Sequence, residues 1–322
     1  MKPKVFVTRH LPLIAFEELS KACSVDIWDE EYPPPYEEMV KRTADKVGIL
    51  CLLTDKVDEN LMDSAPMLRA ISQCAVGFDN IDVPAANHRG IQIGNTPGVL
   101  TDATADFTFT LLLAAARRIG EAIQYVRDRK WITWGLTLLL GQSVYGATLG
   151  IVGLGRIGKA VAKRASGFDM KVIYFDSCQQ PDVEKALDLE YKQLDDLLRL
   201  SDFVSLHVNL SSQTEHLIGR REFGLMKNSA CLINTSRGSV VDTDALYDAL
   251  KGGQIAYAAL DVTDPEPLPP DHKLLSLPNL IVVPHIASAT VSSRTQMALM
   301  AVRNLIAGVK GKPMPYPVND LK

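Results

Sequence analysis

The stretch Thr148-Leu149-Gly150-Ile151-Val152-Gly153-Leu154-Gly155-Arg156-Ile157-Gly158 decides the fold. Its first five residues form an apolar run that predicts a β-strand, and a helical pattern follows the last glycine over residues 159–166. The glycines between them suit a tight strand-to-helix turn, a close backbone approach to a pyrophosphate, and close packing of the helix on the strand. The sequence therefore predicts that Gly153, Gly155, Arg156, Ile157 and Gly158 bind the pyrophosphate of a dinucleotide at a helix N-terminus.

An acidic residue ends the next predicted strand, over residues 171–175. Asp176 follows Gly158 by 18 residues, close to the offset of about 20 residues expected for the acid that holds the adenosine ribose. A carboxylate there accepts hydrogen bonds from the ribose hydroxyls and repels a 2′-phosphate, and residues 177–180 contain no arginine. NAD(H) is therefore predicted in preference to NADP(H). Flavins use the same fingerprint, but the strand-end residues described below favour nicotinamide.

Short apolar runs alternate with helical patterns along most of the chain, which is typical of an α/β protein with parallel, doubly wound sheets. A first strand series is predicted at residues 4–8, 24–27, 47–52 and 70–73, and a second at 148–152, 171–175, 203–206, 231–234, 256–260 and 280–283. Between the two series, a long helix is predicted to open at Thr101 and to close at Arg117 and Arg118, before Gly120. A last helix, over residues 292–309, is expected to pack on the first domain.

The composition limits the classes of protein to which the chain can belong. The chain has 322 residues, with 34 basic and 38 acidic side chains and a formal net charge of −4. This length favours two domains, and the balanced charge argues against binding to nucleic acid or anionic lipid. The longest apolar stretch, residues 107–116, is well short of the ~20 residues that cross a bilayer. A membrane span is therefore not expected.

Cysteine and histidine usage bears on the compartment and on metals. Five scattered cysteines without a CxxC pair are typical of reduced thiols, and the N-terminus lacks the apolar core of a secretion signal, so a cytoplasmic protein is expected. The histidines away from the predicted site show no ligand spacing, and no metal site is predicted. They are His10, His88, His207, His216 and His272.

Polar residues follow the apolar runs of the second strand series, where open α/β sheets bind their ligands. They include His207, Thr235, Arg237, Asp261 and His285. Because the carboxyl ends of parallel strands share one edge of the sheet, these side chains are expected to face one crevice. His207 and Thr235 are predicted to contact the cofactor. Asp261 is predicted to contact the nicotinamide amide, with a helix-capping role as the alternative.

Three residues of this region have side chains of the types that 2-keto acid reduction needs. The reaction needs a cation for the carboxylate, a hydride donor, and an acid that protonates the developing alkoxide. Arg237 and His285 are predicted for the first and last roles. Glu266, in the Asp264-Pro265-Glu266-Pro267 turn, is the candidate carboxylate that favours the imidazolium form of His285. Taken singly, each residue has a structural explanation, and Glu266 alone would be read as a turn carboxylate.

With these residues in place, the sequence resembles the D-isomer-specific 2-hydroxyacid dehydrogenases over nearly its whole length, and most closely their glyoxylate and hydroxypyruvate reductase branch. The resemblance is carried by the glycine fingerprint and five other motifs. These are residues 76–82 (VGFDNID), 95–101 (NTPGVLT), 236–238 (SRG), 261–267 (DVTDPEP) and 284–288 (PHIAS).

The resemblance implies a catalytic trio of Arg237, Glu266 and His285, with the N–H groups of Val76 and Gly77 helping to hold the substrate carboxylate. It also implies that Thr104 lies near the nicotinamide. A discontinuous, flavodoxin-like substrate domain of residues 1–100 and 289–322 would close over a Rossmann-type cofactor domain of residues 101–288. A homodimer is implied as well.

Further pocket residues follow from the same resemblance. Trp134 matches a tryptophan that, in some reductases of this branch, enters the substrate pocket of the partner subunit, although packing at the subunit interface explains it equally well. Leu53 and Ser288 are pocket candidates by position. Several members of the branch carry a basic residue near the position of Asp176 and prefer NADPH, and here the local chemistry favours NADH instead.

The predicted function is NADH-dependent reduction of glyoxylate or hydroxypyruvate to the D-2-hydroxy acid. Two alternatives remain open from sequence. One is another D-2-hydroxyacid dehydrogenase, such as a D-lactate or phosphoglycerate type. The other is a non-catalytic NADH-sensing interaction protein. The sequence leaves open which keto acid is preferred, since one methylene in an apolar pocket changes the binding free energy by only about 1 to 3 kcal/mol.

Overall fold

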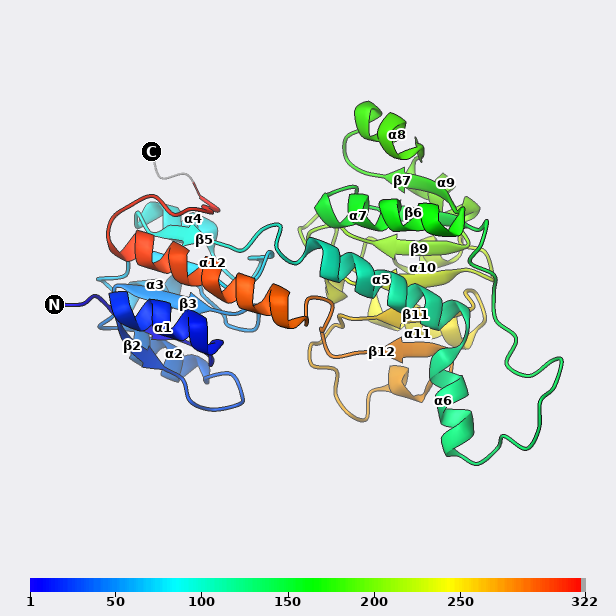
Figure 1. The fold of residues 1–322 in the computed structure, drawn as a ribbon, viewed down its shortest axis with the longest axis horizontal. Coiled ribbons are helices and arrows are strands. Elements are labelled where there is room, and N and C mark those ends of the chain that lie inside the picture. Colours follow the sequence, from blue (N-terminus) through cyan, green and yellow to red (C-terminus); the bar gives the residue numbers. More distant parts are fainter. Residues whose placement is uncertain (320–322) are drawn as a thin grey trace. The chain divides into compact units, whose positions relative to one another are not determined.

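The structure is a computed structural model that describes residues 1–319, and it divides into two compact units (Figure 1). One unit comprises Met1–Leu100 with Ala289–Lys322, and the other comprises Thr101–Ser288. Each unit has its own parallel sheet covered on both faces by helices. The predicted α/β class with two doubly wound sheets is confirmed.

The first unit has a five-stranded sheet in the order β2-β1-β3-β4-β5, which is the doubly wound order of flavodoxin-like folds. Its strands are β1 (Lys4–Val7), β2 (Ser24–Ile27), β3 (Gly48–Cys51), β4 (Ala70–Gln73) and β5 (Gln92–Gly94). Its helices are α1 (Leu13–Ala22), α2 (Tyr36–Thr43), α3 (Glu59–Asp63), α4 (Val83–His88) and α12 (Val291–Val309).

Alternating side chains of these strands fill two separate cores. Val5 and Val7 pack into a cluster with α1 and α12, whereas Phe6 packs into the cluster on the opposite face with α2, α3 and α4. Ile49 and Leu50 of β3 divide in the same way. Strands buried on both faces read as continuous apolar runs, which explains why the first strand series was visible in the sequence.

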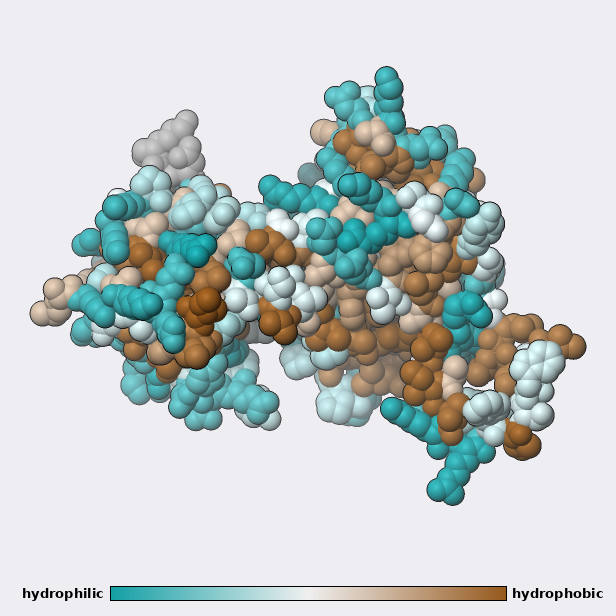
Figure 2. Space-filling model, viewed as in Figure 1, coloured by the Kyte–Doolittle hydropathy of each residue, from teal (hydrophilic) through white to brown (hydrophobic). Residues whose placement is uncertain are grey.

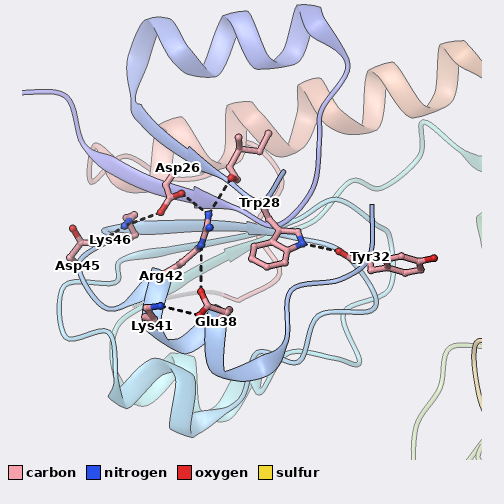
Figure 3. Close-up of polar contacts among 9 residues, drawn as sticks. Asp26, Trp28, Tyr32, Glu38, Lys41, Arg42, Asp45 and Lys46 are labelled. Atoms are coloured by element: carbon pink, nitrogen blue, oxygen red, sulfur yellow. Dashed lines mark hydrogen bonds and ion pairs between the residues drawn. The ribbon is translucent and has the colours of Figure 1, made fainter. Parts of the chain in front are cut away.

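Charged and aromatic side chains hold the outer strand β2, which is only partly buried (Figure 3). The Nη1 atom of Arg42 donates to Oδ1 of Asp26 at 3.0 Å, and its guanidinium lies over the Trp28 ring, 5.0 Å from the centroid. Lys46, with only 8% of its surface exposed, lies 3.3 Å from the same Asp26 carboxylate. The Trp28 indole N–H donates to the Tyr32 carbonyl at 2.8 Å. Ion pairing and cation–π contact therefore supplement the limited apolar burial of this edge.

The second unit has a seven-stranded sheet in the order β12-β11-β10-β9-β6-β7-β8. This is the Rossmann order extended by one strand. Its strands are β6 (Thr148–Val152), β7 (Lys171–Phe175), β8 (Leu189–Tyr191), β9 (Phe203–Leu206), β10 (Cys231–Asn234), β11 (Tyr257–Leu260) and β12 (Leu280–Val282). Its helices are α5 (Thr101–Ala116), α6 (Ile119–Arg127), α7 (Arg156–Ala165), α8 (Pro181–Leu187), α9 (Leu194–Leu200), α10 (Arg220–Phe223) and α11 (Thr243–Lys251).

Three elements differ from the sequence-based expectation. Strands β5 and β8 were not predicted, because each is an outer strand of only three residues with little periodicity. The long helix ends near the predicted place, but Gly120 does not terminate it. The break comes at Arg118, with φ of +53°, and Gly120 lies inside a second helix, α6. A Cβ at Gly120 would lie 3.3 Å from the Ile281 side chain, so this glycine permits close packing instead.

The centre of the second sheet is its topological switch point, between β6 and β9. Gly153 follows β6 with φ of +97°, and a Cβ there would lie 2.8 Å from the backbone of His207, which follows β9. A Cβ at Gly158 would lie only 2.2 Å from the Gly153 carbonyl oxygen. Both predicted glycine roles therefore have a steric basis: α7 can begin directly behind β6 only without side chains at these positions.

His207 lies at this switch point in an environment that disfavours its charged form. Its Nε2 atom is 2.8 Å from the Ser205 hydroxyl, and loss of hydration lowers the pKa of the imidazole to about 3. The ring is therefore neutral in the folded protein at all but strongly acidic pH, although the same side chain binds a proton near its ordinary pKa in the unfolded chain.

We expect His207 to make folding more sensitive to acid. Between its unfolded pKa near 6.5 and its folded pKa of about 3, the unfolded chain binds the extra proton, so stability falls as the pH falls. Relative to His207→Gln, wild type should lose about 2 kcal/mol of unfolding free energy between pH 7 and pH 5. Urea unfolding of both proteins at the two pH values measures this difference. Parallel stability profiles would show that His207 protonates normally in the fold.

Candidate active site

Three neighbouring strands of the second unit carry the predicted catalytic residues at their carboxyl ends. Arg237 follows β10, Glu266 lies in the loop after β11, and His285 follows β12. The structure brings two of them into direct contact, with His285 Nδ1 at 2.6 Å from Glu266 Oε1. Both side chains are partly exposed, at 23% and 30%. The predicted pairing of imidazole and carboxylate is thus present in the geometry.

His285 lies in a turn that a buried carboxylate holds in place. The residue has φ of +52°, an uncommon left-handed conformation for a side chain of this size. Asp261, which is 1% exposed, accepts hydrogen bonds from the N–H groups of Ile286 at 2.7 Å and Ala287 at 2.9 Å. Its own carbonyl accepts from the His285 N–H at 2.9 Å. Burial raises the pKa of the Asp261 carboxyl. Asp261 therefore fixes the turn that contains His285. Its contact with the nicotinamide stays a prediction.

The loop that carries Arg237 is fixed by Asn234, the buried last residue of β10. The Asn234 side chain accepts hydrogen bonds from the Ser236 N–H at 3.0 Å and the Ser236 hydroxyl at 2.8 Å. Its amide group donates to the Arg237 carbonyl at 2.8 Å. Sequence reasoning assigned no role to Asn234. The available signal was a carboxamide at the end of an otherwise apolar strand.

The loops after β10 and β11 are packed on one another. A Cβ at Gly238 would lie 1.9 Å from the Thr263 carbonyl oxygen, so only glycine permits the contact. The Ser239 hydroxyl donates to Asp264 at 2.7 Å, close to the turn that contains Glu266. The positions of Arg237 and Glu266 are therefore coupled through their backbones, which explains why glycine follows the arginine.

The predicted dinucleotide residues form a site that fits such a cofactor. Gly155 is the N-cap of α7, and a Cβ there would meet nothing within 4 Å, so the backbone at this helix N-terminus faces open space. Arg156 is exposed and Ile157 partly buried. The Asp176 carboxylate accepts from the Leu154 N–H at 2.7 Å and, with its other oxygen, from the Ser177 N–H at 2.7 Å. Asp176 is thus held directly beside the glycine turn, where a ribose would follow a pyrophosphate.

Thr104 and Thr235 are linked on the same edge of the second sheet. The Thr108 hydroxyl lies 2.9 Å from the Thr235 hydroxyl and donates to the Thr104 carbonyl at 2.8 Å. All three threonines are buried. Helix α5 is thereby hydrogen-bonded to the end of β10. This supports a shared location for Thr104 and Thr235, while their contact with a nicotinamide remains a prediction.

The predicted substrate residues are distributed over both units. Leu53, Val76 and Gly77 lie in the first unit, after β3 and β4, and each is partly buried. Ser288 is the last residue of the second unit and is 9% exposed. Trp134 is 76% exposed and lies on the segment after α6.

The described residues contain neither a candidate metal site nor a candidate membrane-spanning helix. Over residues 1–319, His, Cys, Asp and Glu side chains form no group of three or more that could hold a metal ion. In the same residues, every helix is too short or too polar to cross a membrane.

Comparisons with known proteins show the family of the chain. Residues 109–287 match the family model described as the NAD binding domain of D-isomer specific 2-hydroxyacid dehydrogenases. The chain is 51% identical over 321 residues to a protein of Korarchaeum cryptofilum (strain OPF8) named glyoxylate reductase, and the match covers 99% of this chain and 97% of the relative.

Solved structures give the same result. A Thermus thermophilus protein of known structure is 45% identical, with a TM-score of 0.92, and the match covers 98% of this chain and 100% of that one. An NADPH-dependent glyoxylate/hydroxypyruvate reductase from Sinorhizobium meliloti, in complex with NADP and malonate, is 32% identical with a TM-score of 0.88, covering 100% and 98% of the two chains. The chain belongs to the D-isomer specific 2-hydroxyacid dehydrogenase family and is an enzyme whose second unit contains a nicotinamide-cofactor-binding domain.

Proposed function

We propose that the enzyme reduces glyoxylate and hydroxypyruvate to the corresponding D-2-hydroxy acids with NADH. The contact between His285 and Glu266, at 2.6 Å, is the observation that carries the chemistry. The choice of substrate is supported by relatives that bear the name glyoxylate reductase, at 51% and 48% identity over 99% of this chain.

In this proposal, His285 is the general acid. Its Nδ1 atom faces Glu266, so proton transfer to the substrate oxygen would use Nε2. A carboxylate at Nδ1 orients the ring, so that a proton carried on Nε2 can be directed at the substrate oxygen. When bound in the second unit, a reduced nicotinamide would supply the hydride that the carbonyl carbon needs. The alkoxide oxygen that develops there takes the proton of His285, which gives the hydroxy acid.

The substrate carboxylate is assigned to Arg237 together with the N–H groups of Val76 and Gly77. A guanidinium holds a carboxylate through two parallel hydrogen bonds, which also orients the keto group. Arg237 is partly exposed, and its loop is fixed by Asn234 at 2.8 Å.

We propose that residues 1–100 and 289–322 form the substrate domain and that residues 101–288 form the cofactor domain. Leu53 and Ser288 are proposed to line the pocket.

The preference for NADH rests on Asp176. Its carboxylate is oriented by the N–H groups of Leu154 and Ser177, at 2.7 Å each, and would repel a 2′-phosphate. The Sinorhizobium meliloti relative is NADPH-dependent, so cofactor choice has to be judged from the residues of this chain. We propose that Thr104, His207, Thr235 and Asp261 complete the cofactor site.

We further propose a homodimer that uses an apolar arm, residues 119–140. Figure 2 shows apolar surface along this segment, which extends away from the rest of its unit in Figure 1. The base of the arm is fixed, because the Gln142 N–H donates to the Ala116 carbonyl at 2.7 Å and Arg118 to the Leu140 carbonyl at 3.3 Å. Its exposed apolar side chains are Ile119, Ile123, Val126, Trp131, Ile132, Trp134, Leu136, Leu138 and Leu140. An apolar patch of this kind is typical of an interface, and Trp134 is proposed to reach the partner's substrate pocket.

Initial rates test the reaction. We expect wild type to oxidise NADH rapidly with glyoxylate or hydroxypyruvate, and more slowly with pyruvate. His285→Ala should lower kcat by about 10²- to 10⁴-fold, the usual contribution of a general acid. His88→Ala, at an exposed position on α4, is the matched control and should keep the wild-type rate. Absence of turnover with all three keto acids would refute the substrate assignment, and full activity of His285→Ala would refute its role.

Cofactor preference can be tested at Asp176. Asp176→Asn removes the charge and keeps a hydrogen-bond acceptor for Leu154, so the ratio of kcat/KM for NADPH to that for NADH should rise by about tenfold. Asp182→Asn makes the same charge change at an exposed position on α8 and should leave the ratio unaltered. Wild-type enzyme that uses NADPH as well as NADH would contradict the assigned role of Asp176.

The dimer proposal predicts a change of mass when the arm becomes charged. Ile132→Asp combined with Leu136→Asp should yield a monomer in sedimentation velocity, whereas wild type should sediment as a dimer. Leu13→Asp places a charge on an exposed apolar position of α1 and should not change the mass. A monomeric wild type, or an arm variant that stays dimeric, would overturn the proposed interface.

A further inference from the structure

Three carboxamide side chains lie at the carboxyl ends of two neighbouring strands, β4 and β5, in the first unit. Gln73 is the last residue of β4, Asn80 lies in the loop that follows β4, and Asn95 comes directly after β5. Gln73 is fully buried, and the other two are partly buried. None of the three has a role in the function proposed above, and we name them the amide cluster.

Asn80 joins two loops of this unit. Its amide group donates to the Leu52 carbonyl at 3.0 Å and to the Asp55 carbonyl at 2.7 Å, on either side of Leu53. Asp55 is itself buried and accepts from the Leu52 N–H at 2.7 Å and from the Thr8 hydroxyl. The loop after β3 therefore has its conformation set by side chains that lie behind it.

Gln73 and Asn95 hold the loop after β4 in the same manner. Gln73 donates to the Gly77 carbonyl at 3.1 Å and to the Asn80 side-chain oxygen at 2.7 Å. Asn95 donates to the Val76 carbonyl at 2.7 Å. Both carbonyls of the Val76-Gly77 pair are thus tied to amide donors. Among the hydrogen bonds of residues 1–319, none is donated by the N–H of Val76 or Gly77.

The direction of these contacts matters, because a peptide group points the carbonyl of one residue and the N–H of the next residue to opposite sides. The Asn95 bond to the Val76 carbonyl therefore directs the Gly77 N–H away from the cluster, where an anion can accept from it. The Val76 N–H shares its peptide group with the Ala75 carbonyl, which accepts from the Thr96 N–H at 3.0 Å. Neutral amides also suit this task better than charged groups, since a buried carboxylate here would repel both the carbonyl oxygens and the substrate carboxylate.

We propose that Gln73, Asn80 and Asn95 are positioning residues that hold the Val76-Gly77 loop so that the Gly77 N–H is directed at the carboxylate of the keto acid. This inference rests on the proposed function, because it takes the substrate carboxylate to bind at this loop. The cluster acts on binding of the substrate and not on transfer of the hydride or the proton, so its loss changes KM more than kcat.

Asn80→Asp and Asn95→Asp test the proposal, because each keeps the size of the side chain and replaces its donor with a carboxylate oxygen. Asn319→Asp is the matched control. Asn319 is a buried carboxamide of the same unit that donates to the Ile91 carbonyl at 2.9 Å and to Asn87 at 2.7 Å. Its loss should lower stability without moving the Val76-Gly77 loop.

We expect each cluster variant to raise KM for glyoxylate by about tenfold, with kcat and KM for NADH within about twofold of wild type. The control should keep the wild-type KM. In Asn80→Asp, the KM defect should shrink between pH 8 and pH 5.5, because a protonated carboxyl can again donate to a carbonyl. A destabilised but otherwise intact enzyme would show no such pH dependence.

Two outcomes would overturn the inference: an unchanged KM in both cluster variants, or an equal rise in KM in the Asn319 control. If Asn80→Asp does not fold, Asn95→Asp decides alone, since it removes a single bond at a partly exposed position. Failure of the proposed function is separately visible, because wild type would then show no glyoxylate turnover at all. Oxamate, a carboxylate competitor, gives the same comparison through its inhibition constant without turnover of the substrate itself.

Discussion

The cofactor domain depends on the absence of side chains at two positions. Helix α7 can begin directly behind β6 because Gly158 has no side chain. A Cβ at this position would lie 2.2 Å from the Gly153 carbonyl oxygen. Gly153 in turn lies against the backbone of His207 at the end of β9. The switch point of the sheet and the N-terminus of α7 are therefore packed directly against each other. Every strand-end residue of the site is positioned by the same sheet.

Catalytic geometry is then built from buried groups that hold loops. Asp261 ties down the N–H groups of Ile286 and Ala287, which keeps His285 in its left-handed conformation. Asn234 fixes the loop of Arg237. The residues that would meet the substrate are partly exposed, but the groups that position them are buried at the ends of neighbouring strands. Positioning and chemistry are thus assigned to different side chains.

The sequence predicted the α/β class, most of the strands, and the pairing of His285 with Glu266. The α/β class and the strands could be predicted because apolar periodicity and the spacing of glycines are local signals in the sequence. The His285–Glu266 pair was expected instead from residue types at strand ends, from the turn around Glu266 and from the family resemblance. The sequence missed β5 and β8, which have three residues each, and the start of α6 at a left-handed Arg118. It also missed Asn234 and the amide cluster. A carboxamide bonded to a backbone carbonyl leaves no periodic pattern, and its partner is defined only when distant strands are adjacent.

The two units fix their loops with side chains of opposite hydrogen-bonding character. At residues 286–287 a carboxylate accepts from backbone N–H groups, so those N–H groups are occupied and any anion near His285 must be held by side chains such as Arg237. At residues 76–77 carboxamides donate to backbone carbonyls, which turns the Gly77 N–H away from them and leaves it available. A buried carboxylate behind a loop occupies the N–H groups of that loop, so they cannot bind an anion. A buried carboxamide that donates to the loop carbonyls leaves N–H groups of the loop free to do so. Within the proposed function, the choice between Asp and Asn or Gln behind each loop decides whether that loop offers backbone N–H groups or only side chains to the carboxylate of a keto acid.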